Sequence, residues 1–427
     1  MVRRHRAVSV KENGAHASKF AGEDVIARRR GAPLARRPGG HVPRYIVGCC
    51  PVGLHRKLDT ERTVREPVQP AQPPAQAAAA IGAGRVKVGL ILPLSGSGNA
   101  AVAAQSMKNA AEMALAEFNS PDLQLLVKDD AGTAPGAQQA AQQALDEGAE
   151  IILGPLFALS VGPVGQLARS RNVPVIAFST DANVASRGVY LLSFLPESDV
   201  ERIIGYAASQ GKKSFAALVP DNAYGTVVEG AFKQAVARRG GRVVAFEHYP
   251  LDRAQMQGPA RTIAQASSRA DAIFVPDGAD AVPTVVQSLI SSGIDTKRVQ
   301  LLGTGLWEDA QIFSSPPLEG AWYAGPDATG FRNFSARYRG RYGQDPVRTA
   351  TLAYDAVALV AALIKTQGAQ RFSEETLTNA SGFTGIDGLF RFKQDGTNQR
   401  GLAVLRVSPT GGQVVSAPPK GFGASGI

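Results

Sequence analysis

The chain has 427 residues, enough for two lobes with cores of their own, and its formal net charge is +10. Residues 1–66 hold 15 of the 46 Lys and Arg and 6 of the 36 Asp and Glu, a balance of +9, so the remainder is close to neutral. The basic pI therefore describes the first segment and gives no reason to expect nucleic-acid binding by the folded part.

Histidine and cysteine are equally uneven. His248 is the one histidine beyond residue 66, and both cysteines, Cys49 and Cys50, precede that point. This distribution excludes a zinc site, a cysteine nucleophile and a structural disulfide in the later residues, and leaves a Ser-His-Asp triad only His248. We predict that the globular part is not an enzyme and uses no cofactor or metal.

Residues 1–66 are rich in Arg, Gly and Pro without sustained periodicity, which predicts disorder, an export segment or a start assigned too far upstream. Tyr45-Ile46-Val47-Gly48-Cys49 resembles a lipoprotein cleavage box with Cys49 as the lipidated residue, but no run of about 7–15 apolar residues precedes it. No apolar run of adequate length follows Arg28-Arg29-Arg30 either, which argues against a twin-arginine export signal there. Residues 67–85, rich in Pro, Gln and Ala, are typical of a flexible linker. Nowhere do 18 consecutive apolar residues predict a membrane-spanning helix.

Short apolar runs alternate with helical periods from residue 86 onward, which predicts buried parallel strands joined by helices. The first helix has Met107, Ala111 and Phe118 on one face and Asn99 as its N-cap. In chain order we expect strands at 86–92, 123–128, 150–153, 173–178 and 189–194, with helices at about 99–119, 135–147 and 159–170.

The alternation then begins again, with helix 199–210 followed by strands 214–219, 242–248, 271–275, 299–303 and 320–325, and helices 225–239, 255–267, 280–292, 331–342 and 349–367. Near the end, 388–392 and 402–407 flank the turn Asp395-Gly396 and are expected to form an antiparallel pair. Two runs of βα units predict an α/β protein of two doubly wound lobes with parallel sheets and a cleft between them. The expected lobes are 86–198 plus 326–384, and 199–325 plus 385–410, with a tail at 411–427.

Ligands of open α/β sheets bind outside the carboxyl ends of the strands, so the turns that follow the strands are the candidate site. Hydroxyl groups at or near helix starts suit a carboxylate, although ordinary N-capping explains each of them alone. Aromatic side chains at strand ends can form the wall of a ligand site, although a core role is equally ordinary. The candidate ligand-binding residues are Ser95, Ser160, Ser179, Thr180, Asp181, Tyr224, Asp277 and Trp307.

Gly96-Ser97-Gly98-Asn99-Ala100-Ala101 fits the dinucleotide fingerprint G-x-G-x-x-A between a strand and a helix. Pro93 precedes the first glycine, and the acidic pair Asp129-Asp130 follows about 30 residues later instead of about 20, so an oxidoreductase is a distant alternative.

The order of motifs resembles the type I periplasmic binding proteins of the leucine/isoleucine/valine-binding class. The resemblance rests on the opening Val86–Gly96, Gly154-Pro155, Val173-Pro174-Val175-Ile176, Asp221-Asn222-Ala223-Tyr224-Gly225 and Gly385–Phe392. It implies three crossovers between the lobes and a periplasmic, non-enzymatic substrate-binding protein that closes on an amino-acid-like ligand and serves an ABC permease. In such proteins lobe one holds the carboxylate, and Ser179, Thr180 and Tyr224 match family positions. Phe157, Ala158 and Leu159 occupy the region of the family's serines.

Within this family, Gly303-Thr304-Gly305-Leu306-Trp307, Leu318–Tyr323 and Gly401–Val404 resemble the penicillin-binding protein activators. This second resemblance implies an envelope lipoprotein, tethered to the membrane through its N-terminus, whose partner is a peptidoglycan synthase. The two implied functions remain alternatives at this point.

Overall fold

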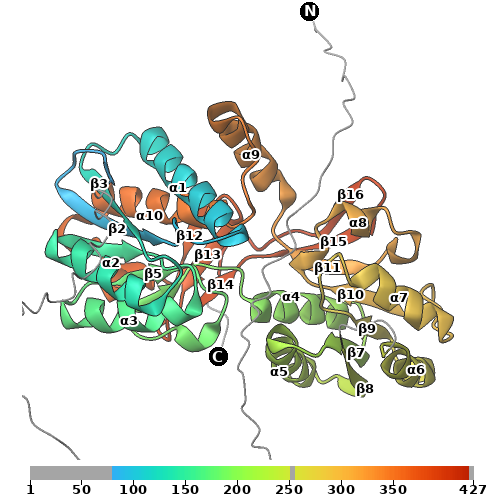
Figure 1. Ribbon diagram of the computed structural model, residues 1–427. Coiled ribbons are helices and arrows are strands. Elements are labelled where there is room, and N and C mark those ends of the chain that lie inside the picture. Colours follow the sequence, from blue (N-terminus) through green and yellow to red (C-terminus); the bar gives the residue numbers. More distant parts are fainter. Residues whose placement is uncertain (1–78, 251–254, 423–427) are drawn as a thin grey trace, which may run out of the picture. The chain divides into compact units, whose positions relative to one another are not determined.

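The structure, a computed structural model, describes residues 79–250 and 255–422 (Figure 1). The basic segment 1–66, Cys49 and most of the expected linker 67–85 lie outside the described residues. Within them, the chain forms two lobes, each built on its own mainly parallel sheet with helices on both faces.

Lobe one is organised around a six-stranded sheet in which β2 to β6 run parallel and β1 is antiparallel to β3 at one edge. The spatial order is β1-β3-β2-β4-β5-β6. The strands are β1 (Ala79–Ile81), β2 (Val86–Leu92), β3 (Leu123–Asp129), β4 (Ala149–Leu153), β5 (Val175–Ala177) and β6 (Val189–Leu191). The sequence predicts β2 to β6 and their parallel direction; β1 falls inside the segment expected to be a linker.

Helices cover both faces of this sheet because its strands are apolar on both sides. Strand β2 contributes to the apolar clusters on both faces. One cluster contains Val88, Leu90 and Leu92, and the cluster on the opposite face contains Ile91. The helices of the first cluster are α1 (Asn99–Phe118), α9 (Ala328–Tyr342) and α10 (Ala350–Gln367), and those of the second are α2 (Ala134–Asp146) and α3 (Ala158–Ser170) (Figure 1).

Lobe two is organised around a seven-stranded sheet in the order β16-β15-β11-β10-β9-β7-β8. Its parallel strands are β7 (Ser214–Pro220), β8 (Arg242–Tyr249), β9 (Ala272–Phe274), β10 (Gln300–Gly303) and β11 (Trp322–Gly325), and its antiparallel strands are β15 (Ala403–Ser408) and β16 (Gly411–Ser416). The helices of the lobe are α4 (Pro196–Ser209), α5 (Ala223–Arg238), α6 (Gln257–Ala266), α7 (Val282–Ser291) and the short α8 (Ala310–Phe313).

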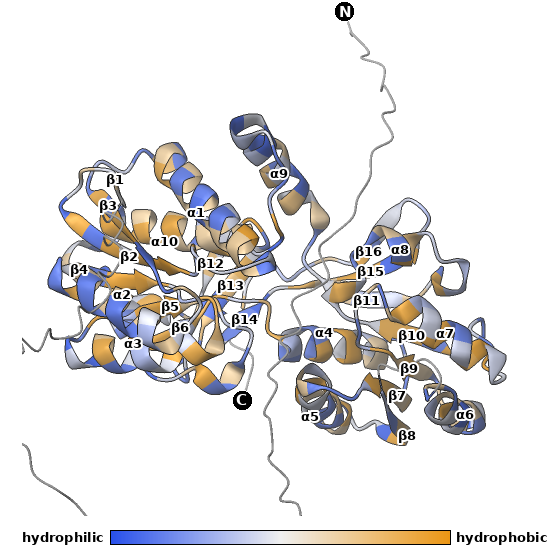
Figure 2. Ribbon diagram, in the orientation of Figure 1, coloured by the Kyte–Doolittle hydropathy of each residue, from blue (hydrophilic) through white to orange (hydrophobic). Residues whose placement is uncertain are grey.

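Two apolar clusters fill lobe two, one on each face of the sheet. Phe215, Ala217 and Val219 of β7 pack with α4 and α5, whereas Ala216 and Leu218 pack with α6 and α7. The strands of both sheets are the most hydrophobic parts of the ribbon, and the helices carry hydrophilic residues away from them (Figure 2). Short 3-10 turns complete the connections: η1 (Ala182–Val184), η2 (Ser267–Arg269), η3 (Gly305–Trp307), η4 (Pro316–Leu318) and η5 (Gly368–Gln370).

The end of the chain differs from the prediction. Strand β13 (Gly388–Phe392) pairs with β12 (Phe383–Gly385) and β14 (Asn398–Arg400) in a small antiparallel sheet that follows the short helix α11 (Glu374–Leu377). The expected pairing of 388–392 with 402–407 is therefore wrong, because β15 crosses to lobe two and pairs with β11 and β16.

The expected lobe boundaries at the C-terminal end need the same correction. Phe390 and Phe392 lie in the core of lobe one, and Asn398 donates hydrogen bonds to the carbonyl oxygens of Leu191 and Ser193 at 2.9 and 2.8 Å. Residues up to Arg400 thus belong with lobe one, and 411–416 is a strand of lobe two and not a tail. The chain passes between the lobes after β6, after β11 and after β14, as the family resemblance implies.

One described helix is long and apolar enough to cross a membrane, by length and composition alone. It spans Ala350–Gln370, and 56% of its most apolar window is buried in the protein. Since α10 packs against α1 in the core of lobe one, burial in that core accounts for its apolar composition.

Candidate functional site

Polar side chains follow three neighbouring strands of lobe two at their carboxyl ends. Tyr224 lies in the first turn of α5 after β7, Asp277 follows β9, and Thr304 follows β10. The Tyr224 hydroxyl lies 3.2 Å from Thr304 Oγ1, so two of these connections meet. The Asn222 side chain caps α5 by accepting the Gly225 N–H at 2.8 Å, which fixes the helix start. A Cβ atom at Gly225 would lie 1.8 Å from the Pro220 carbonyl oxygen, so this turn requires glycine.

Asp277 is held in place by hydrogen bonds from Tyr249 of the sheet and from its own loop. Tyr249, the buried last residue of β8, donates its hydroxyl proton to the Asp277 carboxylate, and the Gly278 N–H donates to Asp277 Oδ1 at 2.7 Å. Burial raises the pKa of Asp277, and the nearby charge of Asp280 adds to the rise. Each carboxylate oxygen has two lone pairs, so Asp277 keeps acceptor capacity for a further donor.

Asp199 joins this region from the start of α4, directly after the first crossover. Its Oδ2 accepts the Gly305 N–H at 2.9 Å and so ties α4 to the turn that follows β10. Burial raises the pKa of Asp199 to about 7, although the Gly305 hydrogen bond and the charge of Arg400 oppose the rise. Asp199 is not among the site residues predicted from the sequence, because an acidic residue in the first turn of a helix is ordinary.

Trp307 is placed differently from the prediction. Its side chain is fully buried in the core of lobe two, with its ring centroid 6.4 Å from that of Tyr323. A Cβ atom at Gly303 would lie 2.1 Å from Trp307 Cδ2, so the ring occupies the space that this glycine leaves. The indole Nε1 is buried with no hydrogen-bond partner among the described residues.

In lobe one, the structure separates the predicted hydroxyls into exposed and buried groups. Ser95 is exposed in the turn after β2, and its N–H donates to both carboxylate oxygens of Asp129 at 3.2 and 3.1 Å. Ser160 is fully buried, with its hydroxyl 3.5 Å from the Thr133 carbonyl oxygen. Burial raises the pKa of Asp130, and a hydrogen bond from Ser160 is among the contacts that limit the rise. Ser160 therefore supports the loop after β3, and Ser95 faces solvent.

The second lobe-one loop, after β5, is ordered by its own side chains. The Ser179 hydroxyl is buried and accepts the Asp181 N–H at 3.1 Å. Asp181 in turn caps η1 by accepting the Asn183 N–H at 2.9 Å. Thr180, between them, is exposed. Of the predicted residues Ser179, Thr180 and Asp181, Thr180 is therefore the one with an exposed side chain.

The start of α3 has a marked apolar character. Phe157 is its N-cap and supplies no side-chain hydrogen bond to the helix, and Leu159 is 51% exposed. This is the region in which the family resemblance places serines. A groove of about 360 Å³ adjoins it between α3 and η1, lined by Ala158, Leu159, Val161, Gly162, Gly165, Arg169, Asn183, Val184, Ala185, Ser186 and Val189.

Charged and aromatic side chains form a buried cluster where the crossovers meet. Phe194, between β6 and α4, has the guanidinium groups of Arg348 and Arg400 each 4.5 Å from its ring centroid. Asp387 accepts hydrogen bonds from Arg348 at 2.9 and 2.5 Å. Arg400 donates its Nε proton to the Ser193 carbonyl at 2.8 Å, while its two Nη atoms are buried with no hydrogen-bond partner among the described residues. We call this set, with Asp355 beside it, the crossover cluster.

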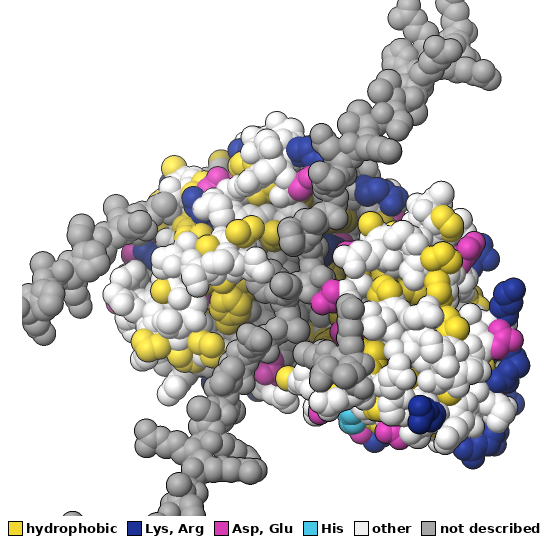
Figure 3. All heavy atoms as spheres, turned by 45° about the vertical axis from the view of Figure 1, so that its right-hand side comes forward, with side chains coloured by type: hydrophobic (Ala, Val, Ile, Leu, Met, Phe, Trp, Pro, Cys, Tyr) yellow, Lys and Arg dark blue, Asp and Glu magenta, His cyan; other side chains and the backbone are white. Residues whose placement is uncertain are grey.

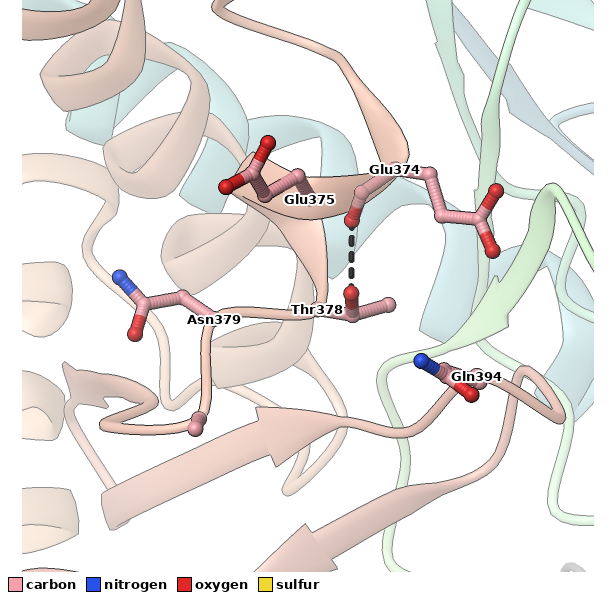
Figure 4. A pocket seen from close by; sticks show the side chains of 6 residues that line it. Glu374, Glu375, Thr378, Asn379 and Gln394 are labelled. Atoms are coloured by element: carbon pink, nitrogen blue, oxygen red, sulfur yellow. Dashed lines mark hydrogen bonds between the residues drawn. The ribbon is translucent and has the colours of Figure 1, made fainter.

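A further pocket, of about 610 Å³, lies beside α11 and the β13–β14 turn (Figure 4). It is lined by Glu374, Glu375, Thr378, Asn379, Ala380 and Gln394. None of the predicted site residues lines it. Among the described residues, no group of three or more His, Cys, Asp and Glu side chains is placed to hold a metal ion.

Comparisons with known proteins agree with this geometry. The model of the family described as "Periplasmic binding protein" matches residues 85–413. A curated relative from Brucella abortus, "Leu/Ile/Val-binding protein homolog 6", is 25% identical over 241 residues, which cover 54% of this chain and 60% of the relative. The match thus spans less than two thirds of that relative's length.

Solved structures show the same fold. An ABC transporter substrate-binding protein from Sphaerobacter thermophilus superposes with a TM-score of 0.63 at 20% identity, over 78% of this chain and 98% of that one. The leucine binding protein LivK from Thermotoga maritima gives a TM-score of 0.55 at 17% identity, over 78% and 99%. With its two parallel-sheet lobes, three crossovers and matched family model, the chain belongs to the periplasmic binding protein family, as a type I member of the leucine/isoleucine/valine-binding class.

Proposed function

We propose that this protein is a non-enzymatic, periplasmic binding protein that captures an amino-acid-like small molecule and presents it to an ABC permease. The observation that carries the proposal is the contact of Tyr224 with Thr304 at the carboxyl edge of lobe two, where ligands of α/β sheets bind, with Asp277 after β9, the strand between β7 and β10. The names of the relatives support the ligand class, and the exposed hydroxyls of Ser95 and Thr180 supply donors at the corresponding edge of lobe one.

In this proposal Asp277 holds the ligand's ammonium group, because it is a partly buried carboxylate positioned by Tyr249 and Gly278. Tyr224 forms a wall of the site, and Leu159 contributes an apolar contact to the ligand side chain. A bound ammonium group favours the charged form of Asp277 and so opposes the rise in its pKa that burial causes.

The test is a ligand panel of amino acids and small carboxylates, measured by thermal shift and calorimetry on the full chain. A ligand present at 100 times its Kd stabilises the folded state by about 2.7 kcal/mol. Asp277→Asn should abolish the shift for amino acids, whereas Glu319→Gln, an exposed carboxylate in the connection that leads into β11, should leave it unchanged. Absence of any shift across the panel, or equal shifts in both variants, refutes the proposal.

A second candidate function has a specific observation in its favour. The apolar start of α3, with Phe157 and exposed Leu159 where the resemblance implies serines, weakens carboxylate binding and suits a protein partner. The alternative is an envelope lipoprotein, anchored through Cys49, that activates a penicillin-binding protein. Purified full-length protein should then raise the rate of glycan polymerisation by such a synthase. No binding and no stimulation by any synthase of the same cell would exclude this alternative.

A further inference from the structure

The two ends of the lobe-two sheet carry opposite charge. The connections that follow β7, β9 and β10 contain Asp221, Asp277 and Glu308, and no Lys or Arg occurs in 219–226, 275–284 or 303–310. At the other end, where β7, β8, β9 and β10 begin, lie six cations: Lys212, Lys213, Arg242, Arg269, Lys297 and Arg298. We call these six residues the amino-edge cations.

Strand register and backbone hydrogen bonds bring the amino-edge cations together. Ser214 of β7 lies opposite Arg242 of β8, whose N–H donates to the Lys213 carbonyl at 2.8 Å. The N–H of Asp271, which precedes β9, donates to the Ser214 carbonyl at 2.8 Å, and the Asp271 carbonyl accepts the Gln300 N–H of β10 at 3.1 Å. The starts of four adjacent strands therefore form one continuous edge.

Little negative charge compensates this edge. Five of the six cations are exposed and Lys212 is half-buried, and none of the six forms an ion pair within the described residues. Two acids lie in the same connections: Asp271, and exposed Asp295, whose Oδ1 accepts the Lys297 N–H at 2.9 Å. Burial opposes the ionisation of Asp271, but hydrogen bonds from the N–H groups of Lys213 and Ser214 and the charges of Lys212 and Arg242 hold the pKa of Asp271 below its usual value.

The C-terminal ends of α4 to α7 point to this edge and attract some basic residues on their own account. That effect explains Arg238 and Arg239 at the end of α5, which are also neutralised by Glu201. The helix dipoles alone do not account for the six amino-edge cations, which lie beyond the ends of these helices. Figure 3 shows dark-blue Lys and Arg side chains along the right-hand rim of lobe two, with a few magenta Asp and Glu side chains among them.

We propose that the amino edge of lobe two is a docking surface for an anionic lipid bilayer. The cations come from four separate connections and five of the six are exposed, an arrangement that matches diffuse negative charge and not one shaped anion. Residues 1–66 of the same chain carry a balance of +9. They cannot neutralise an edge of the same sign, whereas a lipid surface attracts both at once.

This docking leaves the candidate ligand site free. The seven residues of β7 separate the two edges by about 20 Å, at about 3.3 Å per residue. Lipid binding and ligand binding are therefore independent properties, and the failure of one does not decide the other.

The test measures sedimentation of the full chain with lipid vesicles. One set of vesicles is pure phosphatidylcholine, and the other also contains roughly 30–40% phosphatidylglycerol, an anionic lipid. The triple variant Lys213→Gln, Arg269→Gln, Lys297→Gln removes three exposed side chains that make no hydrogen bond or ion pair with the rest of the described protein, and it should melt as the parent does. Each Lys or Arg near an anionic surface raises the membrane partition coefficient by a factor of about five. The triple variant should therefore bind anionic vesicles more weakly than the parent, by a factor of at least about ten. Binding of the parent should also weaken from low to high salt.

The matched control is Arg332→Gln, Lys365→Gln, Lys420→Gln, which removes three exposed cations elsewhere. Retention of parental binding by the control supports a localised surface. An equal loss in both triple variants assigns binding to net charge and overturns the proposal, as does equal binding to uncharged vesicles. Retention on immobilised polyglutamate without binding to vesicles overturns it in favour of an acidic protein partner.

Discussion

The buried carboxylate of Asp387 provides the negative charge that pairs with Arg348 in the crossover cluster. Its side chain is fully buried and accepts two hydrogen bonds from Arg348 and one, at 2.6 Å, from the Thr351 hydroxyl. Burial opposes its ionisation, but the charges of Arg348 and Arg400 hold its pKa below its usual value. The variant Asp387→Asn keeps the shape of the side chain, removes this charge and turns an amide N–H₂ group toward donors.

Breaking a buried ion pair by neutralising one partner costs about 3–5 kcal/mol, because the other charge stays buried and unpaired. Arg348 is 31% exposed and regains part of its hydration, so we expect the lower end, about 3 kcal/mol of the free energy of unfolding. The matched control is Asp345→Asn. Asp345 pairs with Arg339 on the surface, with exposed fractions of 66% and 62%, and its loss should cost no more than about 1 kcal/mol.

Urea unfolding followed by two signals measures this difference. Circular dichroism reports on both lobes, whereas fluorescence reports on lobe two, since the two tryptophans, Trp307 and Trp322, both lie there. Because the cluster joins the crossovers, both midpoints should fall in Asp387→Asn. A loss below about 1 kcal/mol, or one equal to that of Asp345→Asn, would refute the reasoning.

Two more predictions follow from buried groups. Burial raises the pKa of Asp355 to about 7 against 3.8 for an ordinary aspartate, so the folded chain keeps a proton that the unfolded chain loses. Stability should therefore fall as pH rises from about 4 to about 7, and Asp355→Asn should flatten this fall in urea titrations across that range; an unchanged slope contradicts the assignment. Gly303→Ala places a Cβ 2.1 Å from the Trp307 ring and should lower the free energy of unfolding by about 1–3 kcal/mol. Gly162→Ala, with open space in α3, should be neutral or stabilising by about 0.5–1 kcal/mol, and equal melting of the two variants would argue against a packing origin.

Regular βα units were predictable because each depends on local pattern alone. The run Val86-Lys87-Val88-Gly89-Leu90-Ile91-Leu92 is apolar enough to be buried on both faces, and it forms β2 at the predicted residues. The C-terminal segment was not predictable in this way. Asp395-Gly396 does turn the chain, but the strand that follows this turn and pairs with β13 is the short polar Asn398–Arg400, which has no strand pattern of its own.

The candidate site was predictable in part, for a similar reason. The topological rule points to the loops after the strands, and Tyr224 and Asp277 lie there. It cannot tell which way a side chain turns, so buried Trp307 and exposed Thr180 looked equivalent in the sequence. The crossover cluster was missed altogether, because Phe194 and Arg400 are brought together only by the complete fold.

The three crossovers also bear on how the protein is made. Lobe one is assembled from 79–191 and 328–400, and lobe two from 196–325 and 403–416. A ribosome that has released only the first 320 residues has therefore produced neither lobe in full: the first lacks α9, α10 and the small sheet, and the second lacks β11, β15 and β16. Stable tertiary structure must wait until almost the entire polypeptide has been synthesised.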